Sequence, residues 1–143
     1  MATDSIVLEW NENMSFSSHV NGHIINIDAS EEFGGQNLGP RPKPLMMVAL
    51  AGCTGMDVIS ILRKMRIYPD SFQVKIESVL TEDHPKHYTA MKVIYLLTGN
   101  NIPPDKVKRA VQLSEEQYCG VSAVYRKAME LSFEIIINGE IIA

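Results

Sequence analysis

The segment Ala49-Leu50-Ala51-Gly52-Cys53-Thr54-Gly55-Met56-Asp57-Val58 is the centre of the long apolar stretch that decides the fold. Residues 44–67 show no polar face before the aspartate, and a helix that is apolar all round is usually buried. The two glycines each cost about 1 kcal/mol relative to alanine inside a helix. They indicate that something packs closely beside the cysteine, and a second copy of the same helix is one candidate.

Composition and charge exclude several classes of protein. The 143 residues are 45% hydrophobic and 21% charged, which predicts one globular domain over residues 1–143. With a net charge of −4 and scattered basic residues, nucleic acid is not an expected partner. The uncharged stretch 44–56 is shorter than the roughly 20 residues that cross a bilayer, so we predict no membrane span. The first residues lack a positively charged leader, which favours a cytoplasmic location.

Strand patterns flank the apolar helix on both sides. Residues 5–28 alternate apolar and polar side chains, and Asn21-Gly22 is a two-residue hairpin signal because both residues tolerate positive φ. After the helix, residues 72–80 and 88–97 alternate in the same way and predict a second hairpin.

The C-terminal third predicts two helical pieces and a last strand. A helix is expected to open at about residue 102 and keep helical apolar spacing to residue 113. Ser114 and Gln117 have the spacing of a capping box, Gly120 is expected to bend the chain, and residues 131–137 form the last strand. The resulting order, βββ-α-ββ-α(α)-β, places the chain in the α+β class.

Four motifs carry a resemblance to a known family. They are Gly34-Gly35, Gly39-Pro40, Ala51-Gly52-Cys53-Thr54 with Asp57-Val58, and Tyr118-Cys119-Gly120-Val121-Ser122. Together with the element order, they resemble the OsmC/Ohr family of thiol-dependent hydroperoxide reductases. The likeness is greatest to the OsmC-like branch, which has Gly-Cys-Thr at the first cysteine and a lysine, here Lys64, later on the same helix.

The resemblance implies a fold, an activity and partners. It implies an intertwined homodimer in which antiparallel sheets wrap two central helices, with paired active sites at the subunit interface. Cys53 would be the peroxidatic thiolate and Cys119 the resolving thiol. The substrate would be an organic hydroperoxide, and a dihydrolipoyl-type dithiol would reduce the resulting disulfide. No cofactor is expected.

A reactive Cys53 would need a cation nearby, because a buried thiol stays largely protonated at neutral pH. The positive end of the helix dipole fades within the first turn, and Cys53 lies beyond that turn if the helix begins near Pro44. Family members use an arginine held by a glutamate, but residues 1–40 contain no arginine or lysine and no glutamate stands just before the helix. Arg41 is the best substitute, followed by Lys43.

Several residues keep a second interpretation. Cys53 and Cys119 are also typical of structural core positions. An apolar pocket for an alkyl chain could be lined by Met46, Met47, Leu50 and Met56, although such residues are usually core filler. Asp57 lies one turn after Cys53, and if its carboxylate faces the sulfur it would disfavour the thiolate.

The histidines and the missing cation bear on metal binding and on an alternative function. The four histidines, His19, His23, His84 and His87, have no further ligands at a recognisable spacing, so we predict no metal site. The missing arginine–glutamate pair also favours an alternative to the peroxidase. In that alternative, the same scaffold is a non-catalytic dimer that binds an apolar small molecule or acts as a slow thiol sensor.

Overall fold

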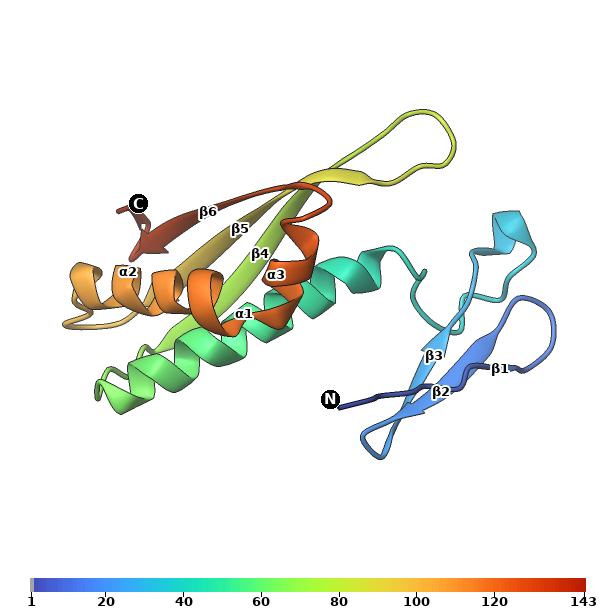
Figure 1. Cartoon of the computed structure of the whole chain (residues 1–143), viewed down its shortest axis with the longest axis horizontal. Coiled ribbons are helices and arrows are strands. Elements are labelled where there is room, and N and C mark those ends of the chain that lie inside the picture. Colours follow the sequence, from blue (N-terminus) through green and yellow to red (C-terminus); the bar gives the residue numbers. More distant parts are fainter. Residues whose placement is uncertain (1) are drawn as a thin grey trace. The chain divides into compact units, whose positions relative to one another are not determined.

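The computed structural model describes residues 2–143, and the chain divides into two compact units, Met1–Met47 and Val48–Ala143. Among the described residues, the strands form one sheet of three strands and one of four, as an α+β fold requires (Figure 1). The expectation of a single domain over residues 1–143 stays a prediction.

The N-terminal unit is an antiparallel sheet in the order β1-β2-β3. Its strands are β1 (Glu9–Trp10), β2 (Phe16–Val20) and β3 (His23–Ile27), and a short 3-10 helix, η1 (Glu31–Phe33), follows. The predicted hairpin turn is confirmed, because Asn21 and Gly22 both have positive φ, 51° and 82°, as a two-residue turn between twisted strands requires.

The loop after β3 is built around the buried carboxylate of Asp28. It accepts hydrogen bonds from the backbone N–H groups of Ala29, Gln36 and Leu38, at 2.7, 3.1 and 3.1 Å. The Gly-Gly and Gly-Pro motifs lie in this same loop. A Cβ on Gly35 or Gly39 would overlap a backbone carbonyl of the chain that leads into the loop, so both positions exclude any side chain.

The C-terminal unit is a four-stranded sheet in the order β4-β5-β6-β7. The strands are β4 (Ser71–Leu80), β5 (Tyr88–Thr98), β6 (Glu130–Ile137) and β7 (Glu140–Ile141). The predicted hairpin is the antiparallel pair β4–β5, but β5 and β6 run parallel. This departs from the expected antiparallel pattern, because a helical crossover between β5 and β6 returns the chain to the same end of the sheet.

The crossover consists of α2 (Pro104–Leu113), a π-helical turn η2 (Ser114–Tyr118) and α3 (Gly120–Tyr125). Pro104 stands in the first turn of α2, where its missing N–H costs nothing. The predicted capping box at Ser114 is wrong, because the helix runs on through this residue in αR conformation. The chain does bend at Cys119, which is extended.

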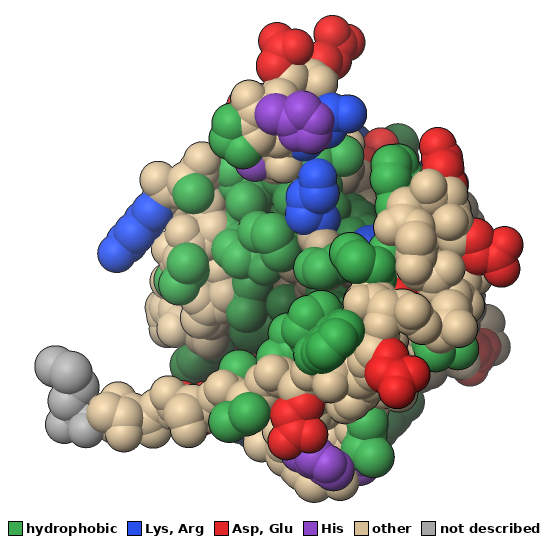
Figure 2. Space-filling view, turned by 90° about the vertical axis from the view of Figure 1, so that its right-hand side faces the viewer, with side chains coloured by type: hydrophobic (Ala, Val, Ile, Leu, Met, Phe, Trp, Pro, Cys, Tyr) green, Lys and Arg blue, Asp and Glu red, His purple; other side chains and the backbone are tan. Residues whose placement is uncertain are grey.

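The long helix α1 (Pro44–Lys64) crosses the boundary between the two units. It buries every fourth residue in one stripe, namely Leu50, Thr54, Val58 and Leu62. Other apolar residues of α1 stay exposed, for example Met56 at 74%. In the single chain the helix is therefore buried along one stripe and not on all sides, and hydrophobic side chains are displayed on the surface of the molecule (Figure 2).

By length and composition alone, α1 would be able to cross a membrane, since its mean hydropathy is 1.9 over an 18-residue window. Its buried stripe nevertheless contacts protein, because Thr54 hydrogen-bonds Tyr95 of β5. Beside the stripe, a Cβ on Gly55 would touch Val74 of β4. These contacts are typical of the core helix of a globular unit.

Candidate functional site

Two sulfurs and a carboxylate converge within the C-terminal unit. The Sγ atoms of Cys53 and Cys119 and a carboxylate oxygen of Asp57 all lie within 4.8 Å of one another. Cys119 is buried, with 4% of its surface exposed, whereas Cys53 is half-buried and both thiols are free. The structure thus brings together the two cysteines that the sequence singled out.

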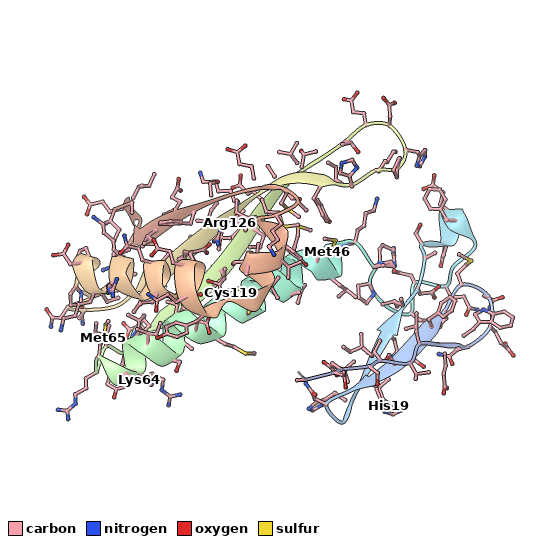
Figure 3. All side chains as sticks on the ribbon, in the orientation of Figure 1. His19, Met46, Lys64, Met65, Cys119 and Arg126 are labelled. Carbon is pink, nitrogen blue, oxygen red and sulfur yellow. The ribbon has the colours of Figure 1, made fainter. Side chains whose placement is uncertain are left out.

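Local structure explains this convergence. Cys53 and Asp57 are four residues apart on α1, so their side chains lie on the same face, one turn apart. Cys119 has φ −78° and ψ 102° at the bend between η2 and α3, and Figure 3 shows it beside α1. Its Sγ accepts the backbone N–H of Ser122 at 3.3 Å, which fixes the sulfur at the start of α3.

Burial raises the pKa of the Cys119 thiol above its usual value. Ser122 opposes this shift by hydrogen bonding, while the neighbouring Cys53 thiol adds to it. The hydroxyl of Ser122 is itself fully buried and makes no well-formed hydrogen bond within the described part of the chain. Cys119 is therefore a protonated thiol at neutral pH in the reduced protein.

A chain of buried hydroxyl groups leads away from Asp57. The Ser114 hydroxyl donates to Asp57 Oδ2 at 2.9 Å and lies 2.8 Å from Thr54 Oγ1. Thr54 Oγ1 in turn lies 2.5 Å from the Tyr95 hydroxyl, which is 2.8 Å from Glu115 Oε1. Four hydrogen bonds thus connect two carboxyl groups through three hydroxyls.

The number of available protons constrains the charge of this hydrogen-bonded series of side chains. Three hydroxyls supply three protons, so four hydrogen bonds are filled only when one carboxyl group is protonated. Glu115 is the more buried of the two, at 8% exposure. Burial raises its pKa, and the hydrogen bond with Tyr95 and the charge of Arg126 only partly offset this. Burial therefore pushes Glu115 toward the protonated form that would supply a fourth proton.

Arg126 lies at the Glu115 end of the chain of hydroxyl groups. Its Nη2 donates to the backbone oxygen of Glu115 at 2.7 Å and lies 3.6 Å from Glu115 Oε2. Figure 3 shows this arginine on the short helical segment that also carries Cys119. The guanidinium thus holds the π-helical turn in place against α3.

A cavity opens beside Asp57. It has a volume of about 450 Å³ and is lined by residues from α1 and from the crossover, namely Asp57, Ser60, Ile61, Lys64, Leu113 and Tyr118. The ammonium of Lys64, on the same helix as Asp57, is the cation of this lining. The cavity gives small molecules a route to the carboxylate beside the thiols.

Arg41 belongs to the N-terminal unit and has its own structural partners. Its guanidinium donates to the backbone oxygen of Gly39 at 2.7 Å and to Asn37 Oδ1 at 2.6 Å. It also borders an apolar hollow of about 350 Å³ within that unit, together with Phe16 and Ile27. These contacts hold the loop after β3, and the catalytic role of Arg41 stays a prediction.

The predicted pocket residues have different environments. Leu50 is fully buried in the core, whereas Met56 is 74% exposed and borders a surface hollow with Arg63 and Lys64. Met46 and Met47 are half-buried at the start of α1. These residues thus differ in exposure, and a pocket for an alkyl chain lined by all four stays a prediction.

Sequence reasoning missed the hydroxyl chain, although a signal for it was present. The apolar spacing of Val107, Ala110 and Val111 in α2 continues to Ser114 and Glu115, so two polar residues occupy core positions. Buried polar groups need hydrogen-bond partners. Thr54, next to Cys53 on the buried stripe of α1, is one of those partners.

Comparisons with known proteins agree with this architecture. A profile described as OsmC-like protein matches residues 34–134. Protein YhfA of Escherichia coli is 31% identical over 132 residues, covering 90% of this chain and 96% of YhfA. The crystal structure of a hypothetical protein from Aquifex aeolicus has a TM-score of 0.83 and 26% identity, over 96% of this chain and 98% of that one.

A more distant solved structure is an organic hydroperoxide resistance protein OsmC from Legionella pneumophila. Its TM-score is 0.64 at 14% identity, and the match covers 95% of this chain and 99% of that chain. At this level of identity the likeness concerns the fold alone. It shows that the two-sheet arrangement with a long helix is shared with a protein of that description.

Proposed function

Because the chain belongs to the OsmC-like protein family, we propose that it is a cysteine-based peroxidase that reduces organic hydroperoxides. The family assignment supports a redox role. The observation that carries the proposal is the approach of the Cys53 and Cys119 sulfurs to within 4.8 Å. The two sulfurs of a redox pair must approach to about 2.05 Å to form the disulfide bond. From the observed spacing, the sulfurs need to move only a short distance.

The proposed reaction has two steps. The Cys53 thiolate attacks the terminal oxygen of the hydroperoxide, the O–O bond breaks, and the leaving alkoxide takes a proton to become an alcohol. Cys53 is then a sulfenic acid. The Cys119 thiol condenses with it, releasing water and forming a disulfide, and an external dithiol of the dihydrolipoyl type returns two electrons. The half-buried Cys53 suits the first role and the buried Cys119 suits the second.

The proposal includes a homodimer with active sites at the subunit interface, in the cytoplasm. Support comes from α1, which leaves Val48 and Met56 exposed, at 63% and 74%, and from Gly52, where a Cβ would have no atom within 4 Å among the described residues outside its own stretch of helix. An apolar helix face of this kind needs a cover in water. Sedimentation velocity of the full chain, expected to give twice the mass of the chain, tests this part.

Arg41 remains the proposed cation for activating Cys53. Its chemistry suits the role, since a guanidinium both favours a thiolate and stabilises an alkoxide that leaves. Arg41→Ala is expected to slow oxidation of Cys53, and Lys43→Ala tests the second candidate in the same assay. Equal oxidation rates in wild type and Arg41→Ala would remove Arg41 from the mechanism.

The position of the Asp57 carboxylate favours a second candidate function. Its carboxylate lies beside both sulfurs, and a negative charge there disfavours the thiolate on which peroxide reduction depends. The alternative is a dimer without turnover, which binds an apolar small molecule or responds slowly through its thiols.

The deciding experiment follows oxidation of the reduced protein by cumene hydroperoxide and by H₂O₂ in stopped flow. Wild type is expected to react faster with the organic peroxide and to lose two mass units per chain as the disulfide forms. Cys119→Ser is expected to stop at the sulfenic acid, and Cys53→Ser to remain unreacted. Oxidation of wild type no faster than that of a free thiol would favour the alternative.

A further inference from the structure

The cysteine pair and Asp57 have the chemistry and spacing of a metal-binding set. Thiolate and carboxylate are both zinc ligands, and a tetrahedral site with Zn–S bonds of about 2.3 Å holds its sulfurs about 3.8 Å apart. The three ligand atoms of Cys53, Asp57 and Cys119 lie within 4.8 Å of one another. Closing the set around an ion thus requires movements of about 1 Å, which side-chain rotation supplies.

Asp57 is the residue that peroxide chemistry leaves without a role. Beside a nucleophilic sulfur its charge is unfavourable, but around a divalent cation the same charge is an advantage. We propose that the reduced chain binds one Zn²⁺ through Cys53 Sγ, Cys119 Sγ and the Asp57 carboxylate. The metal-bound form and the disulfide are then alternative states of one cysteine pair.

Neighbouring groups orient these ligands. The Ser114 hydroxyl occupies Asp57 Oδ2 at 2.9 Å, which leaves the other carboxylate oxygen for the metal. Cys119 Sγ receives the backbone N–H of Ser122, and the buried Ser122 hydroxyl is available as a further donor. Hydrogen bonds of this kind to metal ligands fix their orientation and raise affinity.

Three protein ligands leave the fourth position of a zinc site to water. Asp57 lines a cavity of about 450 Å³, from which that water would come. Two thiolates favour Zn²⁺ over Mg²⁺ or Ca²⁺, which prefer oxygen ligands. Binding requires both sulfurs as thiolates and so releases thiol protons to solvent, and the ion with its three anionic ligands carries one net negative charge.

The inference goes beyond the proposed function and does not depend on it, because metal binding requires only the reduced thiols. Zn²⁺ engages both sulfurs, so a loaded chain is expected to resist oxidation. The sequence led us to expect no metal, because cysteines and acidic residues do not stand at a recognisable ligand spacing along the chain, whereas the fold brings Cys119 to Cys53 and Asp57.

The test titrates Zn²⁺ into the full-length, reduced, chelator-treated protein by calorimetry, with Co²⁺ as a visible probe of tetrahedral thiolate coordination. We expect one ion per chain with release of two protons. Each ligand variant is expected to weaken binding by at least the roughly 10- to 100-fold that loss of an outer-shell partner costs, and Cys53→Ser and Cys119→Ser are expected to weaken it more than Asp57→Asn does. Asp83→Asn, in the exposed β4–β5 loop, is the control and is expected to bind as wild type does.

Two results would overturn the inference. One is the absence of stoichiometric binding by the reduced protein. The other is an Asp57→Asn protein that keeps wild-type affinity, with a native circular dichroism spectrum, since the carboxylate would then not be a ligand. Peroxide consumption is measured separately on metal-free protein, so failure of the peroxidase and failure of the metal site are distinguishable.

Discussion

Asp28 of the N-terminal unit and Glu115 of the C-terminal unit are buried to a similar extent, with 4% and 8% of their surfaces exposed. Their pKa values nevertheless move in opposite directions. Burial acts to raise the pKa of Asp28, but hydrogen bonds from three backbone N–H groups and the charge of Arg41 hold it below its ordinary value. At Glu115 burial prevails and the pKa rises. The number of hydrogen-bond donors, not the degree of burial, therefore decides the direction in which each pKa moves.

The same difference separates the two units as a whole. The N-terminal unit organises a loop around a charged group, while its strands leave large apolar residues exposed, among them Trp10 at 66% and Ile24 at 61%. The C-terminal unit encloses an apolar core and a chain of hydroxyl groups that ends at Glu115, whose pKa burial raises. Stability is therefore expected to reside mainly in the C-terminal unit.

The largest expected effect comes from shortening a buried side chain in the core of the C-terminal unit. Leu62→Ala removes a side chain with no exposed surface and should lower the free energy of unfolding by about 2–5 kcal/mol. Ile24→Ala, on the exposed face of β3, should change it by about 0.5 kcal/mol or less. Urea denaturation of both variants measures the contrast. Equal losses would mean that something covers β3 and that the comparison between the units fails.

The hydroxyl chain is the next target. Thr54→Val keeps the shape of the side chain but leaves Ser114 and Tyr95 each with a lost partner, so a loss of about 1–3 kcal/mol is expected. Thr89→Val, at an exposed position with one long hydrogen bond, is the control. If both variants unfold at the same urea concentration, the hydroxyl chain contributes nothing to stability.

Much of the fold was predictable because local patterns determine it. Alternation located the strands, and Asn21-Gly22 identified the hairpin, since its two positive φ values suit few other residues. Strand direction was harder. The alternation of β6 is the same in a parallel and an antiparallel pair, so its parallel pairing with β5 depends on the crossover and not on the strand.

The candidate site was predictable only in part. The cysteines were identified by resemblance, and Asp57 by its position one turn after Cys53. Ser114 was assigned to a cap, because its own segment gave no indication of the side chains of α1 against which it packs. The one-sided burial of α1 has a similar cause, since composition shows that a helix is apolar but not which of its faces pack against the rest of the protein.

Asp28→Asn tests the charged half of the comparison. In wild type the lowered pKa means that stability is present above the unfolded pKa of about 3.8 and is lost as the pH falls below it. Fluorescence of Trp10, the only tryptophan, should therefore stay constant from pH 8 to about 4 and change in acid. Asp28→Asn should be altered already at neutral pH and lack that acid step, whereas Asp4→Asn should follow wild type.

Glu115→Gln tests the neutral half and has the smallest expected effect. Because the folded-state pKa of Glu115 is raised, wild type loses stability as the pH rises from about 4.5 through that pKa. Glutamine cannot ionise, and its amide N–H supplies the proton that the hydroxyl chain needs. The variant should be as stable as wild type in acid and equal or slightly more stable at pH 8, with Glu116→Gln, at an exposed neighbouring position, as control. A marked loss at pH 8 would mean instead that the ionised carboxylate and its contact with Arg126 hold the crossover, and that burial had not prevailed at Glu115.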